Sequence, residues 1–103
     1  MNVRITSRKF RAKPTLKDFI KEELKSLEKF EDRILGANVV LSFTHPKDSI
    51  KSAEIVLSLP GKIISVTEST EDFEKSVSIA VQKIRKQISK LKTKRTVRKK
   101  NED

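Results

Sequence analysis

Residues 53–66, with the sequence AEIVLSLPGKIISV, decide the fold of this chain. Hydrophobic residues alternate with other residues before and after Pro60-Gly61, which is the pattern of two half-buried β-strands. Proline fixes one backbone dihedral angle of a tight turn, and glycine permits the next one. We therefore expect two antiparallel strands joined by a tight turn.

Two more strands are expected on the N-terminal side of this hairpin. Val39, Leu41 and Phe43 alternate with other residues, and residues 46–48, Pro-Lys-Asp, supply a turn before the hairpin. Residues 2–8 alternate in the same way. No helix-like stretch separates the last three strands, so we expect them to be antiparallel neighbours.

Two helices are expected where hydrophobic residues recur every three or four positions. The first begins at Thr15 as its N-terminal cap, with Asp18 in the first turn, and Gly36 closes the connection after it. The second begins at Ser69 or Thr70, and acidic residues follow near its positive end. The two hydrophobic faces are Leu16, Phe19, Ile20, Leu24, Leu27 and Phe30 in the first helix, and Phe73, Val77, Ala80, Val81, Ile84, Ile88 and Leu91 in the second.

The expected fold class is α+β, in the order β-α-β-β-β-α, with a four-stranded mixed sheet and two helices on one face. The first two strands are expected to be parallel because a helix connects them. Residues 1–91 form this domain and carry a net charge of +6. Residues 92–103 hold six Lys and Arg against two acidic residues, so we expect a basic C-terminal tail that is disordered when free.

The composition favours a partner with many negative charges. The 103 residues include 24 Lys and Arg and 14 Asp and Glu, which gives a net charge of +10. No hydrophobic run approaches the roughly 20 residues of a membrane span and no signal-peptide pattern is present, so a cytoplasmic protein without a membrane partner is expected. Cysteine is absent, which excludes disulfides and thiolate metal sites within this sequence.

Lysine residues lie opposite the hydrophobic face of each predicted helix. The rows are Lys17, Lys21, Lys25 and Lys29 in the first helix, and Lys83, Lys86 and Lys90 in the second. If the helices pack side by side, the rows lie roughly parallel on one surface and match rows of RNA phosphates. For the first row a solubilising surface is an equal alternative, because Glu22 and Glu28 lie beside it.

Other candidate residues point to no enzyme, cofactor or small-molecule substrate. His45 has no second His or Cys to complete a metal site, so we interpret it as a loop residue. Glu71, Asp72 and Glu74 are explained by the start of a helix. Phe10, in the basic connection before the first helix, is the one aromatic residue left to face a ligand.

Three stretches carry a resemblance to a known family. They are residues 24–34, LKSLEKFEDRI; residues 39–41, VVL; and a helix that Glu71-Asp72 opens and residues 83–88, KIRKQI, end. Together with the order and spacing of the elements, they resemble the ribosome hibernation-promoting factors, also called ribosome-associated inhibitors or sigma-54 modulation proteins. The resemblance spans nearly all of residues 1–92.

The resemblance implies a fold similar to double-stranded RNA-binding domains and a site between the head and body of the small ribosomal subunit. There the protein would overlap messenger RNA and the A- and P-site tRNA, and inhibit translation under stress or in stationary phase. Expected partners are the small subunit with its rRNA, the intact ribosome, and a helper protein if ribosomes dimerise. Carried over by position, the RNA-binding residues are Lys25, Lys29, Lys83, Arg85, Lys86 and Lys90, with Lys21, Lys92 and the tail as further additions.

One segment departs from the family pattern. The family usually opens the second helix with Asp-Met-Tyr-Ala-Ala-Ile-Asp, whereas residues 72–78 read DFEKSVS. Contacts of that tyrosine and second aspartate are therefore not carried over. The alternative function is a general double-stranded RNA-binding or RNA-chaperone domain acting away from the ribosome, and an enzyme acting on RNA is a third.

Overall fold

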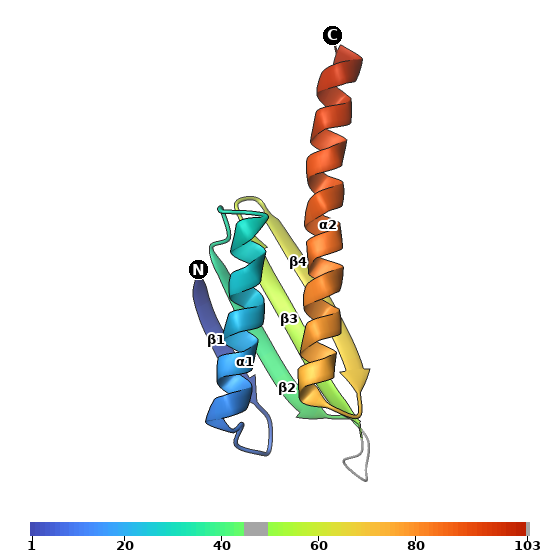
Figure 1. The fold of residues 1–103 in the computed structure, drawn as a ribbon. Coiled ribbons are helices and arrows are strands. Elements are labelled where there is room, and N and C mark those ends of the chain that lie inside the picture. Colours follow the sequence, from blue (N-terminus) through green and yellow to red (C-terminus); the bar gives the residue numbers. More distant parts are fainter. Residues whose placement is uncertain (45–49, 103) are drawn as a thin grey trace.

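The chain folds in the predicted order β-α-β-β-β-α, with a short 3-10 helix after the first helix (Figure 1). This computed structural model describes residues 1–44 and 50–102, with side chains as far as residue 91. The predicted turn at Pro46 and the predicted loop residue His45 lie outside the described residues. The elements are β1 (Asn2–Ser7), α1 (Pro14–Lys25), η1 (Ser26–Lys29), β2 (Gly36–Phe43), β3 (Lys51–Leu59), β4 (Lys62–Thr70) and α2 (Phe73–Glu102).

The strands form one mixed sheet in the order β1-β2-β3-β4, which confirms the predicted topology. β1 pairs with β2 in parallel, whereas β3 is antiparallel to both of its neighbours. In the hairpin that decides the fold, Leu59 pairs with Lys62 across Pro60-Gly61, and Gly61 has a φ of 71°. Glycine suits this turn because it adopts positive φ without a steric penalty.

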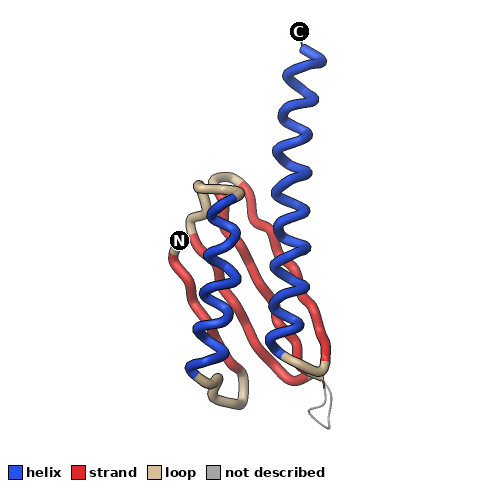
Figure 2. Tube along the Cα trace, in the orientation of Figure 1, coloured by secondary structure: helices blue, strands red, loops and turns tan. Residues whose placement is uncertain are grey.

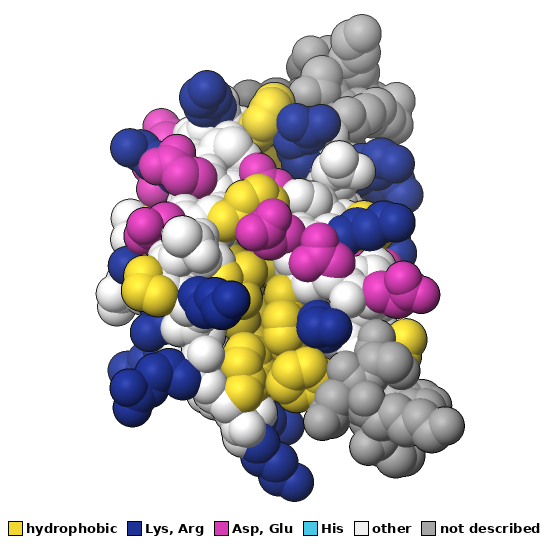
Figure 3. Space-filling model, turned by 60° about the horizontal axis from the view of Figure 1, so that its bottom comes forward, with side chains coloured by type: hydrophobic (Ala, Val, Ile, Leu, Met, Phe, Trp, Pro, Cys, Tyr) yellow, Lys and Arg dark blue, Asp and Glu magenta, His cyan; other side chains and the backbone are white. Residues whose placement is uncertain are grey.

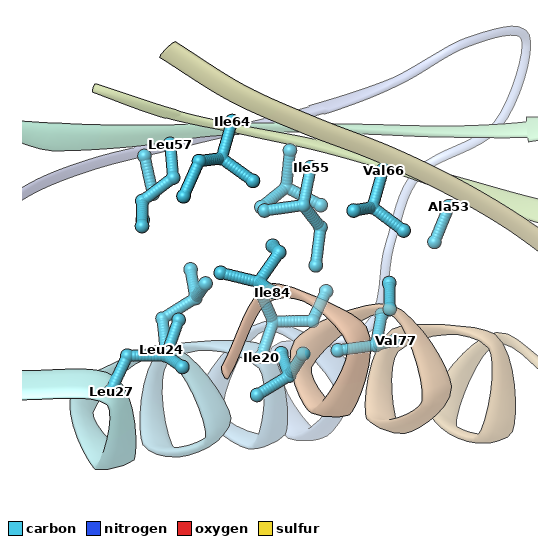
Figure 4. Packing of buried hydrophobic residues seen from close by; sticks show 14 of the residues in the cluster. Ile20, Leu24, Leu27, Ala53, Ile55, Leu57, Ile64, Val66, Val77 and Ile84 are labelled. Carbon is cyan, nitrogen blue, oxygen red and sulfur yellow. The ribbon is translucent and has the colours of Figure 1, made fainter. Parts of the chain in front are cut away.

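Both helices cover the same face of the sheet, as Figure 2 shows. Alternating residues of the strands meet the hydrophobic faces of the helices because strand side chains point to opposite faces in turn. Ile55, Ile20 and Ile84 are all 0% exposed and come from β3, α1 and α2 (Figure 4). This single core holds the outer helix surfaces in fixed positions relative to one another.

The first helix begins two residues earlier than predicted, and it ends at Lys25, before the last residue of the predicted hydrophobic face, Phe30. Pro14 is its first residue and Lys13 its N-terminal cap, without a side-chain hydrogen bond, so the prediction of Thr15 as the cap is wrong. Proline suits this position because its φ is already helical and it lacks an N–H that would need a partner. The chain then tightens into η1, which therefore holds Lys29.

α2 begins at Phe73, so the predicted start at Ser69 or Thr70 is also wrong. β4 continues to Thr70, which pairs with Lys51 of β3. Asp72 takes the capping place, because its Oδ1 accepts a hydrogen bond of 3.3 Å from the Glu74 N–H. The buried Ser76 hydroxyl donates to the Lys51 carbonyl at 2.8 Å and fastens the start of α2 to β3.

α2 does not end near Leu91 but continues as a helix to Glu102. Neither glycine nor proline occurs between Phe73 and Glu102, and Lys and Arg are good helix formers, so nothing in the sequence stops the helix. The division into a domain of residues 1–91 and a tail of residues 92–103 that is disordered when free stays a prediction.

Candidate nucleic-acid interface

The lysine row of α1 lies on the flank that faces away from α2. Glu23 lies on the opposite flank, which faces α2, because its Oε1 accepts a hydrogen bond of 2.8 Å from the Ser78 hydroxyl of α2. Lys21 and Lys25 are each two residues from Glu23 and therefore about 200° away around the helix axis. Both ammonium groups are exposed, as are Lys17 and, in η1, Lys29.

The lysine row of α2 lies on the flank next to β4. The Lys83 Nζ is 2.6 Å from Oε2 of Glu68, a residue of β4. Lys86 and Lys90 are exposed farther along the same side of α2. Glu68 therefore offsets part of the positive charge of this row, although no acidic residue lies between Lys75 and Lys100 in the sequence.

Arg85 is the predicted RNA-binding residue that faces the seam between the helices. Its guanidinium carbon lies 5.1 Å from the centre of the Phe30 ring, a cation–π distance. Lys83 is two residues away and so on the far flank of α2. Lys21 and Lys83 thus lie on opposite flanks of the helical layer, and Arg85 lies between the two helices.

Lys92 is the one predicted site residue whose side chain the structure does not describe. It belongs to the helical backbone of α2, one position beyond the last described side chain. Its assignment, like that of the other predicted RNA-binding residues, stays a prediction.

A further group of cations lies in the loop between β1 and α1. Arg8, Lys9, Arg11 and Lys13 are all exposed, and none of them makes an ion pair with another described residue. Figure 3, which brings this end of the molecule forward, shows Lys and Arg side chains along its lower edge, whereas farther up Asp and Glu side chains lie among further Lys and Arg side chains. These cations are not among the predicted RNA-binding residues; the local charge of the first residues of the chain is the signal that points to them.

Phe10 of this loop is a packing residue, so the expectation that it faces a ligand is wrong. Its ring stacks on Phe73 at a centroid distance of 5.1 Å and an interplanar angle of 10°. It also meets the edge of Phe43 at 5.1 Å. The sequence conceals this cluster because the three rings come from a loop, the end of β2 and the start of α2.

The buried acid Glu31 serves the fold. It is 4% exposed, and its Oε1 lies 2.6 Å from Nε of Arg33. This hydrogen bond, together with the negative charge of Glu31, raises the pKa of Arg33 above its ordinary value. The pair fixes the turn between η1 and β2.

The described residues show no site for a metal ion. Among the side chains that the structure describes, within residues 1–44 and 50–91, no three His, Cys, Asp or Glu are grouped so that they could hold one. Glu71, Asp72 and Glu74 lie at the start of α2 as predicted, and Asp72 is used there as its cap. None of the helices described is long and apolar enough to cross a membrane.

Residues 3–96 match the family described as Sigma 54 modulation protein / S30EA ribosomal protein. A curated relative, the ribosome hibernation promotion factor of Bacillus subtilis (strain 168), is 26% identical over 94 residues, which are 91% of this chain and 50% of the relative. The chain therefore spans about half the length of that relative.

Two solved structures share the fold. The Protein Y N-terminal domain of Thermus thermophilus is 28% identical with a TM-score of 0.78, and the alignment covers 88% of this chain and 99% of that one. A ribosomal subunit interface protein from Coxiella burnetii is 22% identical with a TM-score of 0.82, covering 90% of this chain and 99% of that one. The four-stranded sheet with two helices on one face is thus common to all three proteins.

Proposed function

Because the chain belongs to the Sigma 54 modulation protein / S30EA ribosomal protein family, we propose that it is a ribosome hibernation factor. It binds the small ribosomal subunit between head and body, overlaps messenger RNA and the A- and P-site tRNA, and inhibits translation in the cytoplasm under stress or in stationary phase. The observation that carries this proposal is the family match over residues 3–96, in which the two helices and the sheet all take part.

The exposed cations of the helical layer are the proposed contacts with rRNA. Ammonium and guanidinium groups bind phosphate oxygens without reading the base sequence, which suits an irregular RNA surface. Arg85 is held at the seam by the Phe30 ring, and Lys83 exchanges its Glu68 carboxylate for a phosphate on binding. The proposed contacts are Lys25, Lys29, Lys83, Arg85, Lys86 and Lys90, with Lys21 and Lys92 at the periphery.

Inhibition follows from occupancy and needs no catalytic step. A protein bound in the path of messenger RNA and tRNA excludes both for as long as it stays bound. The partners are therefore the small subunit and the intact ribosome, with a helper protein where ribosomes dimerise.

Sedimentation of a stationary-phase lysate through a sucrose gradient tests the proposal. The protein is expected to travel with small subunits and intact ribosomes at low salt, and to leave them as salt rises, because phosphate contacts release counterions. A protein that remains at the top of the gradient but binds duplex RNA would instead be a general RNA-binding domain. That result would contradict the proposed function.

A further inference from the structure

The positive charge of the chain is unevenly distributed along its length. Residues 1–17 contain six Lys and Arg and no Asp or Glu. Residues 18–91, which include both lysine rows except Lys17, contain twelve Lys and Arg and twelve Asp and Glu. The net charge of +6 on residues 1–91 therefore comes entirely from the first 17 residues.

Four of those six cations lie in the β1–α1 loop, residues 8–13. Arg8, Lys9, Arg11 and Lys13 are exposed, whereas the two other residues of the loop, Phe10 and Ala12, turn toward the core. Ala12 is 4% exposed. The loop thus presents four charges to solvent and keeps its hydrophobic side chains inside.

The loop is held at both ends and in its middle. The Arg8 N–H donates to the Leu41 carbonyl at 2.9 Å, and the Lys13 carbonyl accepts the N–H groups of Leu16 and Lys17 at 3.0 and 3.1 Å. Between these ends, Phe10 is stacked on Phe73. A loop fixed in this way loses little conformational entropy when it binds a ligand.

Lys9 adopts a backbone conformation that is unusual for a residue with a side chain. Its φ is 64°, and it is the one residue other than glycine with a positive φ among those described. Such a conformation persists only where the surrounding contacts determine it, and it occurs frequently at binding sites. Here the reversal at Lys9 lets the Phe10 ring point inward while the neighbouring cations point outward.

We infer that the β1–α1 loop is a second RNA phosphate-binding site, separate from the lysine rows of the helices. The inference rests on the proposed function in one respect, since it takes rRNA as the partner. Arginine suits this task because its guanidinium group can bind two phosphate oxygens at once. An anionic membrane fits less well, because interfacial binding needs exposed hydrophobic side chains to insert and those of this loop face the core.

The test compares two double variants that each remove two exposed cations. Arg8→Gln/Arg11→Gln alters the loop, and Arg4→Gln/Lys75→Gln alters exposed cations outside both proposed binding regions. Binding of each full-length variant to purified small ribosomal subunits is measured over a range of salt concentrations. Thermal unfolding of both variants checks that the fold is kept.

If each arginine neutralises one phosphate, the slope of log affinity against log salt falls by about 1.5, and the affinity at ~0.1 M salt falls roughly 10- to 50-fold. The control variant is expected to keep the slope of the unaltered protein. An unchanged slope for Arg8→Gln/Arg11→Gln, with the unaltered protein still bound to subunits, overturns the inference and leaves the proposed function intact.

A second experiment distinguishes failure of the loop inference from failure of the proposed function. If the unaltered protein does not bind small subunits at all, the proposed function fails, and the same variants are compared on a duplex RNA and on phosphatidylglycerol vesicles. A lower salt slope on the duplex for the loop variant alone supports an RNA phosphate site. A loss confined to the vesicles overturns it.

Discussion

The cations of α2 and those of the β1–α1 loop differ in what lies beside them. Lys83 of α2 is 2.6 Å from the Glu68 carboxylate, whereas the four loop cations make no ion pair with any described residue. The α2 row is carried by a helix that packs on the sheet, whereas the loop is held by backbone hydrogen bonds at its ends and by the Phe10 ring between them. A nearby carboxylate therefore compensates part of the positive charge of the α2 row, whereas the positive charge of the loop is less compensated.

The largest expected effect is a loss of stability on substitution in the buried face of α2. Ile84→Ala removes a fully buried side chain and is expected to lower the free energy of unfolding by about 2–5 kcal/mol. Urea unfolding followed by circular dichroism measures the loss. Lys83→Ala, the exposed neighbour, is the control and should change stability by less than about 1 kcal/mol; equal losses would mean that the helix is not held by its buried face.

Removal of the α2 row itself should act on binding and not on folding. Lys83→Ala/Lys86→Ala/Lys90→Ala is expected to weaken inhibition of cell-free translation by roughly 10- to 100-fold, because up to three phosphate contacts are lost. Thermal unfolding should be nearly unchanged, since exposed charges contribute little to stability. Unaltered inhibition would move the binding surface away from α2.

The aromatic cluster tests how firmly the loop is held. Phe10→Ala is expected to lower the free energy of unfolding by about 1–3 kcal/mol, less than a fully buried phenylalanine, because Phe10 is half-buried. Amide exchange of residues 8–13 should also become faster. If exchange in the loop is as slow as in the unaltered protein, Phe10 is not what fixes it.

The smallest expected effect concerns Glu68. Glu68→Gln frees Lys83 and raises the net charge by one, so binding to small subunits should tighten by roughly two- to fivefold while stability changes by less than about 1 kcal/mol. Glu54→Gln, on β3, makes the same change of charge away from the row and serves as control. Equal tightening in both variants would show that only the total charge counts.

The element order could be predicted from the sequence, and the ends of the helices could not. Alternation and three- to four-residue periodicity report which residues face the core, and the core dictates the order of strands and helices. The start of α2 at Phe73 instead depends on how far β4 pairs with β3, which reaches Thr70. That register is a contact between distant residues and leaves no local signal.

The candidate site, too, could be predicted from the sequence only in part. Helical spacing correctly predicts that Lys25, Lys86 and Lys90 are exposed. It cannot show that Glu68 lies against Lys83, because the partner comes from a strand 15 residues earlier. It also cannot show that Phe10 is packed, since two of the three rings in the cluster lie far from it in sequence.

The length of α2 has a consequence for the rate at which the protein finds RNA. At 1.5 Å per residue, the eleven residues after Leu91 carry the helix roughly 16 Å farther, and Figure 1 shows it rising past the sheet. The loop between β1 and α1 lies at the opposite end of the molecule. The molecule is 57 Å long and carries positive charge at both ends, so it attracts a polyanion over a wide range of orientations. A larger fraction of diffusional encounters should therefore lead to binding, which raises the association rate.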